Sequence, residues 1–215
     1  MKADLPSIIA LADLAGIGVF ALTGALMAVR LRQTLVTAGF FALVTGVGGG
    51  SVRDLLIGAP VFWIQDGAVA AVCIAIALLV WVTPERWWQG RLLEWADAVG
   101  LAAYSVFGTA KATSWGVPVV PALLMGVITG CVGGIIRDML AGVPSIIIRP
   151  EIYVTAAALA SGLYLLLIWI GAGTAVAAIA GAAAGFALRG AAIRWSLALP
   201  VYRGRDDQRA GRGHF

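Results

Sequence analysis

Long apolar segments alternate with short polar connections along almost the whole chain. A helix needs about 20 mostly apolar residues to cross the hydrocarbon core of a bilayer, and seven segments come close to this length. They are roughly Ser7–Val29, Thr34–Ile57, Asp66–Val82, Leu92–Thr113, Pro118–Ala141, Glu151–Ile170 and Thr174–Leu199. The pattern predicts an all-α integral membrane protein, with seven transmembrane helices in a single domain over residues 1–200 and a polar cytoplasmic tail over residues 201–215.

The composition supports this class and argues against several functions. Apolar residues make up 61% of the 215 residues and charged residues 12%, against about 45–50% and about 25% in soluble domains. The two cysteines, Cys73 and Cys131, lie inside apolar segments without a CxxC pattern, and the single histidine, His214, is in the tail. We therefore expect no metal site, no cofactor and no enzyme activity.

The basic residues gather on one side of the predicted membrane. This side carries Arg30, Arg32, Arg86, Arg91, Arg149, Arg203, Arg205, Arg209 and Arg212, whereas the other side carries Lys2 and Lys111. Cytoplasmic connections are enriched in Lys and Arg, so the N-terminus is expected outside and the C-terminus in the cytoplasm. Topology accounts for the basic charge, and nucleic acid is not expected as a partner.

The first half of the chain is repeated in the second half at a shift of 84 residues. Residues 13–60 and 97–144 share 15 of 48 positions without a gap, including the strings GVGGGSVRD (Gly46–Asp54) and GCVGGIIRD (Gly130–Asp138). Each copy holds three spans, an odd number, so the second copy must enter the membrane from the opposite side. The sequence thus predicts an inverted repeat, residues about 7–82 against about 91–170, plus a seventh helix at about 174–199. Such repeats recur in transport proteins.

The glycine clusters predict bends in the second and fifth helices. Gly48, Gly49 and Gly50 fall late in the second helix, and Gly133 and Gly134 fall at the same place in the fifth. A glycine cluster invites a kink or an unwound turn, and unwound backbone at membrane depth must face protein or a water-filled cavity. We therefore expect these glycines to flank a passage.

The charged residues expected to be buried in the membrane are nearly balanced. They are Asp13, Asp54, Asp97 and Asp138 against Arg53, Lys111 and Arg137. An unpaired buried charge is costly, and adjacent residues on a helix do not face each other. We therefore expect each arginine to pair with an aspartate on another helix, rather than Arg53 with Asp54.

The second copy is more polar than the first. Lys111 stands opposite Met27, while Tyr104 and Ser105 stand opposite Phe20 and Ala21. Lys111 either reaches the interface at the outer end of its helix or acts in the permeation path as a gate. The polar positions suggest a pore on the side of the fourth and fifth helices, lined by Tyr104, Ser105, Lys111 and Asp138.

The doubled GGxxRD pattern, followed by GAP at 58–60 and GVP at 142–144, resembles the prokaryotic branch of the trimeric intracellular cation (TRIC) channels. These proteins are also known as glycine-transporter-domain or UPF0126-type membrane proteins. The resemblance covers about residues 7–199. It implies a homotrimer in a bacterial or archaeal inner membrane, with an hourglass pore in each protomer for monovalent cations, mainly potassium. It also implies kinks at Gly48–Gly50 and Gly133–Gly134.

One part of the resemblance is incomplete. Animal members carry a lysine-glutamate-valine motif that binds a phosphoinositide lipid, and the matching place here reads KAT, Lys111 to Thr113. The lysine is kept and the acidic residue is absent, so membrane lipid is expected as a partner without this form of regulation.

Three other functions compete with a channel. A secondary carrier for small amino acids such as glycine would also suit an inverted repeat. A membrane-embedded enzyme lacks a catalytic cluster, because GVGGGS has no P-loop lysine. A structural bundle would explain packing glycines such as Gly181 and Gly185, but not the repeated charges.

Overall fold

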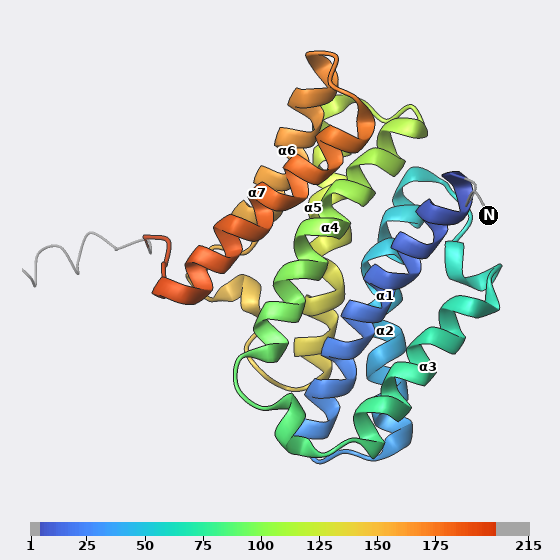
Figure 1. The fold of residues 1–215 in the computed structure, drawn as a ribbon, viewed down its shortest axis with the longest axis vertical. Coiled ribbons are helices and arrows are strands. Elements are labelled where there is room, and N and C mark those ends of the chain that lie inside the picture. Colours follow the sequence, from blue (N-terminus) through green and yellow to red (C-terminus); the bar gives the residue numbers. More distant parts are fainter. Residues whose placement is uncertain (1–4, 201–215) are drawn as a thin grey trace, which may run out of the picture.

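The computed structural model describes residues 5–200, with side chains from Asp13 onward. This part of the chain forms seven long helices and three short 3-10 turns, which lie in the connections between the second and third, the third and fourth, and the fifth and sixth helices (Figure 1). The helices are α1 (Leu5–Arg30), α2 (Leu35–Ile57), α3 (Gly67–Val82), α4 (Leu92–Ser114), α5 (Val119–Leu140), α6 (Val154–Trp169) and α7 (Thr174–Trp195), and the turns are η1 (Phe62–Ile64), η2 (Glu85–Trp88) and η3 (Ile146–Ile148). All seven predicted helices are present. The predicted cytoplasmic tail lies outside the described residues.

Two helix ends differ from the prediction by three or more residues. Helix α7 ends at Trp195 instead of Leu199, because Ser196 adopts a left-handed conformation with φ of 52°. Helix α6 begins at Val154 instead of Glu151. The connection before α6 is extended, and its Glu151 pairs with Ala198 in an isolated antiparallel bridge. The segment after α7 is therefore tied to the connection that leads into α6.

Within the described residues, four helices are long and apolar enough to cross a membrane by themselves: α1, α2, α5 and α7. Helices α3 and α6 have 16 residues each, which spans about 24 Å at 1.5 Å per residue. Helix α4 carries Glu94, Asp97 and Lys111. The less apolar and shorter helices depend on their neighbours, and α4 packs against α1, α5, α6 and α7.

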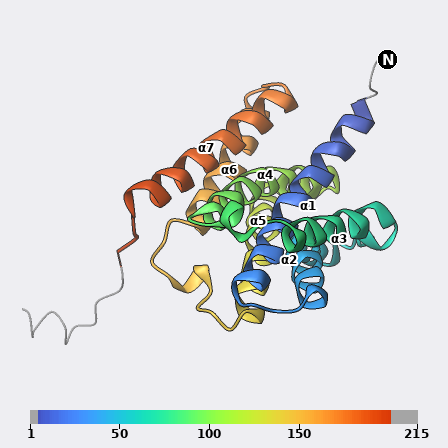
Figure 2. The same ribbon diagram turned by 60° about the horizontal axis from the view of Figure 1, so that its bottom comes forward.

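The two copies of the repeat have the same order of elements and opposite directions. Helices α1, α2 and α3 correspond to α4, α5 and α6, and η1 and η3 are separated by the repeat shift of 84 residues. Helices α1 and α4 run antiparallel near the middle of the bundle, with α3 on one side and α6 and α7 on the other (Figures 1 and 2). Helix α2 packs against α5, and helix α1 packs against α4. These two contacts form the interface between the copies.

The central glycines bring helices α2 and α5 into backbone contact. A Cβ atom added to Gly49 would overlap the carbonyl oxygen of Thr129, and one added to Gly133 would overlap that of Thr45. Gly49 corresponds to Gly133 in the repeat, and Thr45 corresponds to Thr129, so each contact is the repeat counterpart of the other. The two contacts are therefore related by a local two-fold axis. Helical structure continues without a break through both glycine clusters. The expectation of an unwound turn is therefore wrong, and Gly49 and Gly133 serve close helix packing.

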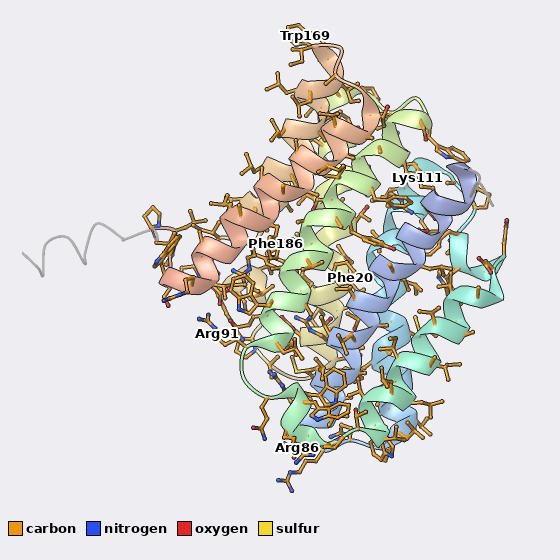
Figure 3. All side chains as sticks on the ribbon, in the orientation of Figure 1. Phe20, Arg86, Arg91, Lys111, Trp169 and Phe186 are labelled. Carbon is orange, nitrogen blue, oxygen red and sulfur yellow. The ribbon has the colours of Figure 1, made fainter. Side chains whose placement is uncertain are left out.

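Between α1 and α4, aromatic side chains pack against the glycines of the opposite helix. The rings of Phe20 and Tyr104 meet edge to face, with centroids 5.4 Å apart and an interplanar angle of 88°. Each ring lies over a glycine of the other helix, Phe20 over Gly100 and Tyr104 over Gly16. Phe20 lies between the two ends of the bundle, with Lys111 toward one end and Arg91 and Arg86 toward the other (Figure 3).

Candidate functional site: two charge clusters at opposite ends of the bundle

The RD motif and the glycine after it form one local structure in both copies. Asp138 Oδ1 accepts a hydrogen bond from Arg137 Nε at 3.0 Å, while its Oδ2 accepts one from the backbone N–H of Ile146 at 3.0 Å. The chain leaves helix α5 through Gly142, whose φ is 65°, and the N–H of Val143 donates to the carbonyl of Asp138. Each aspartate thus holds the connection after its helix in place.

The first copy repeats these bonds. Asp54 accepts from Arg53 Nε at 2.9 Å and from the backbone N–H of Phe62 at 3.2 Å, and the chain turns at Gly58 with φ of 70°. The expectation that Arg53 and Asp54 are not partners is therefore wrong. Adjacent residues on a helix do not face each other because their Cβ atoms point in directions about 100° apart. The arginine side chain is long enough to curve around the helix and reach the carboxylate of its neighbour.

Replacing Gly142 by alanine is expected to destabilise the protein by about 1–2 kcal/mol, because a residue with a Cβ atom is disfavoured in a left-handed conformation. The corresponding change at Gly58 should have the same effect. Thermal unfolding in detergent measures both. Gly67→Ala is the matched control, since Gly67 lies at the start of α3 without a positive φ and has open space around its Cβ position. Equal melting temperatures for Gly142→Ala and Gly67→Ala would contradict a left-handed conformation at Gly142.

At one end of the bundle, Arg137 joins three helices. We call this group the basic-end cluster, because it lies toward Arg30 and Arg91. The Arg137 guanidinium bonds to Asp97 of α4 at 2.7 Å, to Asp138 at 2.9 Å and to the hydroxyl of Thr23 in α1 at 3.0 Å. All four side chains are buried. Arg137 therefore has the expected partner on another helix, in addition to its own neighbour.

A second group of charges lies at the other end of the bundle and includes a lysine. We call Asp13, Arg53, Asp54 and Lys111 the N-terminal-end cluster. The ammonium of Lys111 lies 2.8 Å from Asp54 Oδ1, the same oxygen that Arg53 Nη2 contacts at 2.8 Å. Lys111 also lies over the Phe62 ring, 5.8 Å from its centroid. The lysine side chain is 22% exposed. Lys111 is thus held by an intramembrane carboxylate instead of only reaching toward the interface.

Asp13 does not pair with an arginine, contrary to expectation. Its carboxylate accepts a hydrogen bond from the hydroxyl of Tyr104 at 2.7 Å. In the repeat, Asp97 corresponds to Asp13 and Phe20 corresponds to Tyr104. Phe20 has no hydroxyl to donate to Asp97, so Asp97 remains available to Arg137. The Arg53 guanidinium instead lies 5.6 Å from the ring centroid of Phe107.

The remaining predicted residues lie between helices. Ser105 donates to the carbonyl of Leu101 in its own helix at 2.7 Å, and it lies against Gly130 and Gly126 of α5. Ser105 is therefore a packing residue and belongs to neither cluster. Of the glycines, Gly48 faces Ile136, Gly50 faces the Phe62 ring and Gly134 faces the Tyr153 hydroxyl.

A cavity of about 380 Å³, lined by both charged and apolar side chains, leads to the basic-end cluster. Asp97, Arg137 and Asp138 line it together with Arg189 of α7. Arg189 was missed by the sequence analysis. Its side chain is 2% exposed and bonds to Glu151 at 2.8 Å, which holds the connection before α6 against α7. A lone arginine in the apolar string AGFALRGAA was the available signal.

Comparison with known proteins gives one consistent result. A family model described as glycine transporter matches the chain twice, at residues 10–85 and 94–169, which is again a shift of 84 residues. A UPF0126 membrane protein of Vibrio cholerae is 38% identical over 202 residues, covering 91% of this chain and 83% of that protein. The UPF0126 inner membrane protein YadS of Escherichia coli K12 is 37% identical over 196 residues, covering 88% and 94%.

Solved structures agree with these relatives. The chain is similar to the TRIC trimeric intracellular cation channel orthologue from Rhodobacter sphaeroides, with a TM-score of 0.83 and 39% identity over 89% of this chain and 100% of that chain. A second structure, from work on conductance through TRIC cation channels, has a TM-score of 0.82 and 28% identity over 92% and 98%.

Proposed function

The chain belongs to the UPF0126 family of membrane proteins, the prokaryotic branch of the TRIC family, and from this membership we propose that it is a cation channel of a bacterial inner membrane. The relatives it matches are membrane proteins and channels, so the protein is not an enzyme. The finer proposal is a pore within each protomer of a homotrimer, which conducts monovalent cations and mainly potassium.

The observation that carries the proposal is the pair of buried charge clusters at the repeat interface. Ionisable residues inside a membrane are costly and mark ion pathways or relays, and inverted repeats place their site where the two copies meet. The basic-end cluster and the N-terminal-end cluster lie on α1, α2, α4 and α5, the helices that form this interface.

An hourglass pore would narrow between the two clusters. Phe20 and Tyr104 meet there edge to face, and each ring covers a glycine of the opposite helix. We propose this ring contact as the waist and the glycine clusters of α2 and α5 as the places where these helices bend when the pore opens.

Lys111 is the proposed gate. Its ammonium is bound to Asp54 and lies over Phe62 in the connection after α2, so it links α4 to the end of α2. Breaking the contact between Lys111 and Asp54 would open the proposed pore at the end of the N-terminal-end cluster. With basic residues on the opposite side, the positive-inside rule places Lys111 toward the outside and the C-terminus in the cytoplasm.

Single-channel recording in planar bilayers tests the function. In a potassium chloride gradient with choline as the replacement cation, we expect unitary currents that reverse near the potassium equilibrium potential. Lys111→Met should raise the open probability several-fold. Arg86→Met is the control, because it also removes one positive charge, from an exposed residue of η2 outside both clusters. Saturable counterflow of glycine without unitary currents would instead establish the carrier that the family name suggests.

A further inference from the structure

A tethered cation completes the N-terminal-end cluster. The ammonium of Lys111 is 2.8 Å from Asp54 Oδ1 and faces the ring of Phe62. The same oxygen of Asp54 also contacts Arg53. This geometry shows that one aspartate of the RD motif holds two positive groups at once, the neighbouring arginine and a cation from another helix.

At the basic end, a cavity occupies the place of the lysine. The shift of 84 residues relates Lys111 to Met27, Phe62 to Ile146 and Asp54 to Asp138. Met27, Ile146 and Asp138 all line the cavity of about 380 Å³. A thioether carries no charge, so the group that binds Asp54 in one copy has no equivalent on the chain in the other.

The two clusters differ by one positive charge. The N-terminal-end cluster has two carboxylates and two cationic groups, namely Asp13, Asp54, Arg53 and Lys111. The basic-end cluster has two carboxylates and one cationic group, namely Asp97, Asp138 and Arg137. Buried charges are normally paired, so the basic-end cluster is one cation short.

One buried carboxylate oxygen of this cluster is only weakly held. Asp97 is 2% exposed, and within residues 13–200 its Oδ2 makes no hydrogen bond of good geometry, although the Tyr153 hydroxyl lies beside this carboxylate, against Gly134. Asp97 lines the cavity. Oxygen atoms of carboxylates are the usual ligands of hard cations, and rings of aspartate or glutamate select cations in channels.

We propose that a monovalent cation binds in this cavity beside Asp97 and Asp138, at the position that the Lys111 ammonium occupies in the other copy. The proposal rests on the proposed function, because it names the ion-binding residues of that channel. One missing charge fits a monovalent ion better than a divalent one, since Arg137 is bound to the same two carboxylates.

The arginines around the cavity mouth each bond to an acidic side chain or a backbone carbonyl, although Arg189 Nε, within the described residues, has no partner. Arg91 bonds to Glu94 and Arg189 bonds to Glu151, both at 2.8 Å. Arg30 donates to the backbone carbonyls of Trp88 and Gly90 at 3.3 and 3.0 Å. These arginines outnumber the acidic residues at the mouth and would attract anions, so the test must distinguish a cation from an anion.

The test measures cation binding by thermal unfolding of the purified full-length protein in detergent, with potassium chloride titrated against choline chloride at constant ionic strength. We expect a saturable rise in melting temperature with potassium. Met27→Lys supplies the missing ammonium on the chain and should abolish this rise. Met139→Lys is the control, because it adds the same charge at an exposed position of α5 outside the cavity, and it should keep the rise. The exchange variant Met27→Lys/Lys111→Met keeps the total charge and should move binding to the N-terminal end.

Anomalous diffraction from crystals soaked in rubidium or bromide locates the ion in the unmodified protein, even if Met27→Lys fails to fold. A rubidium peak between Asp97 and Asp138 supports the proposal, and its movement toward Asp54 in the exchange variant supports it further. A bromide peak in the cavity, or a potassium effect that survives in Met27→Lys, overturns it. Binding without unitary currents would refute the channel and leave the site intact, whereas currents without a rubidium peak would refute the site alone.

Discussion

Replacing Arg137 by alanine is expected to lower the free energy of unfolding by about 3–5 kcal/mol, the usual cost of removing one partner from a buried ion pair. The change leaves Asp97 and Asp138 buried together without the guanidinium that bonds to both, and it removes the bond to Thr23. Thermal unfolding in detergent and the fraction of protein that elutes as a single oligomer measure the effect. Loss of cation conduction should accompany it.

Arg149→Ala is the matched control for this experiment. Arg149 is 47% exposed and lies 3.7 Å from Glu151, and exposed pairs contribute about 0–1 kcal/mol. Arg53→Ala should fall between the two variants, because Asp54 keeps its contact with Lys111. If Arg137→Ala were as stable as Arg149→Ala, the role of Arg137 as the link between α1, α4 and α5 would be refuted.

Replacing Gly49 by alanine is expected to destabilise the protein by about 1–3 kcal/mol, the usual cost of overpacking. The added methyl group would overlap the backbone carbonyl of Thr129, and a backbone atom cannot move aside without separating α2 from α5. Gly133→Ala should have the same effect through the carbonyl of Thr45. Thermal unfolding of both variants and of the double variant measures the cost.

Gly39→Ala provides the control in the same helix. No atom lies within 4 Å of a Cβ added to Gly39, and alanine is favoured over glycine within a helix by up to about 1 kcal/mol. Gly39→Ala should therefore leave the melting temperature unchanged or raise it. A drop as large as that of Gly49→Ala would mean that helix propensity or bending, not contact with α5, decides the role of the central glycines.

The general fold was predictable because it depends on the length of the apolar segments and on the repeat, and both can be read from the sequence alone. Apolar segments of membrane length predicted the seven helices, and the coincidence of charged residues and prolines at one shift predicted the duplication. The buried positions of Arg53, Asp54, Arg137 and Asp138 were also expected, because these charges lie inside apolar segments.

The details of the site were less predictable, since they depend on side-chain length and on contacts between helices. The glycine clusters suggested unwinding, but Gly49 and Gly133 meet the backbone of a neighbouring helix, which no pattern within one helix reveals. The arginine of each RD motif reaches its own neighbour. Ser105 was predicted as a pore residue because it is polar, and the bond of its hydroxyl to the carbonyl of Leu101 within α4 could not be foreseen from the sequence.

The reciprocal contacts between α2 and α5 explain how the two ends of the bundle came to carry different side chains. The Gly49–Thr129 contact and its Gly133–Thr45 counterpart form an isologous interface, the kind that two identical subunits make around a two-fold axis. In a dual-topology homodimer of identical three-helix units, any substitution appears on both faces of the membrane. Lysine at one end and methionine at the other, as at Lys111 and Met27, requires the two halves to be encoded separately. Duplication of the three-helix unit therefore permits the inner and outer mouths to carry different side chains.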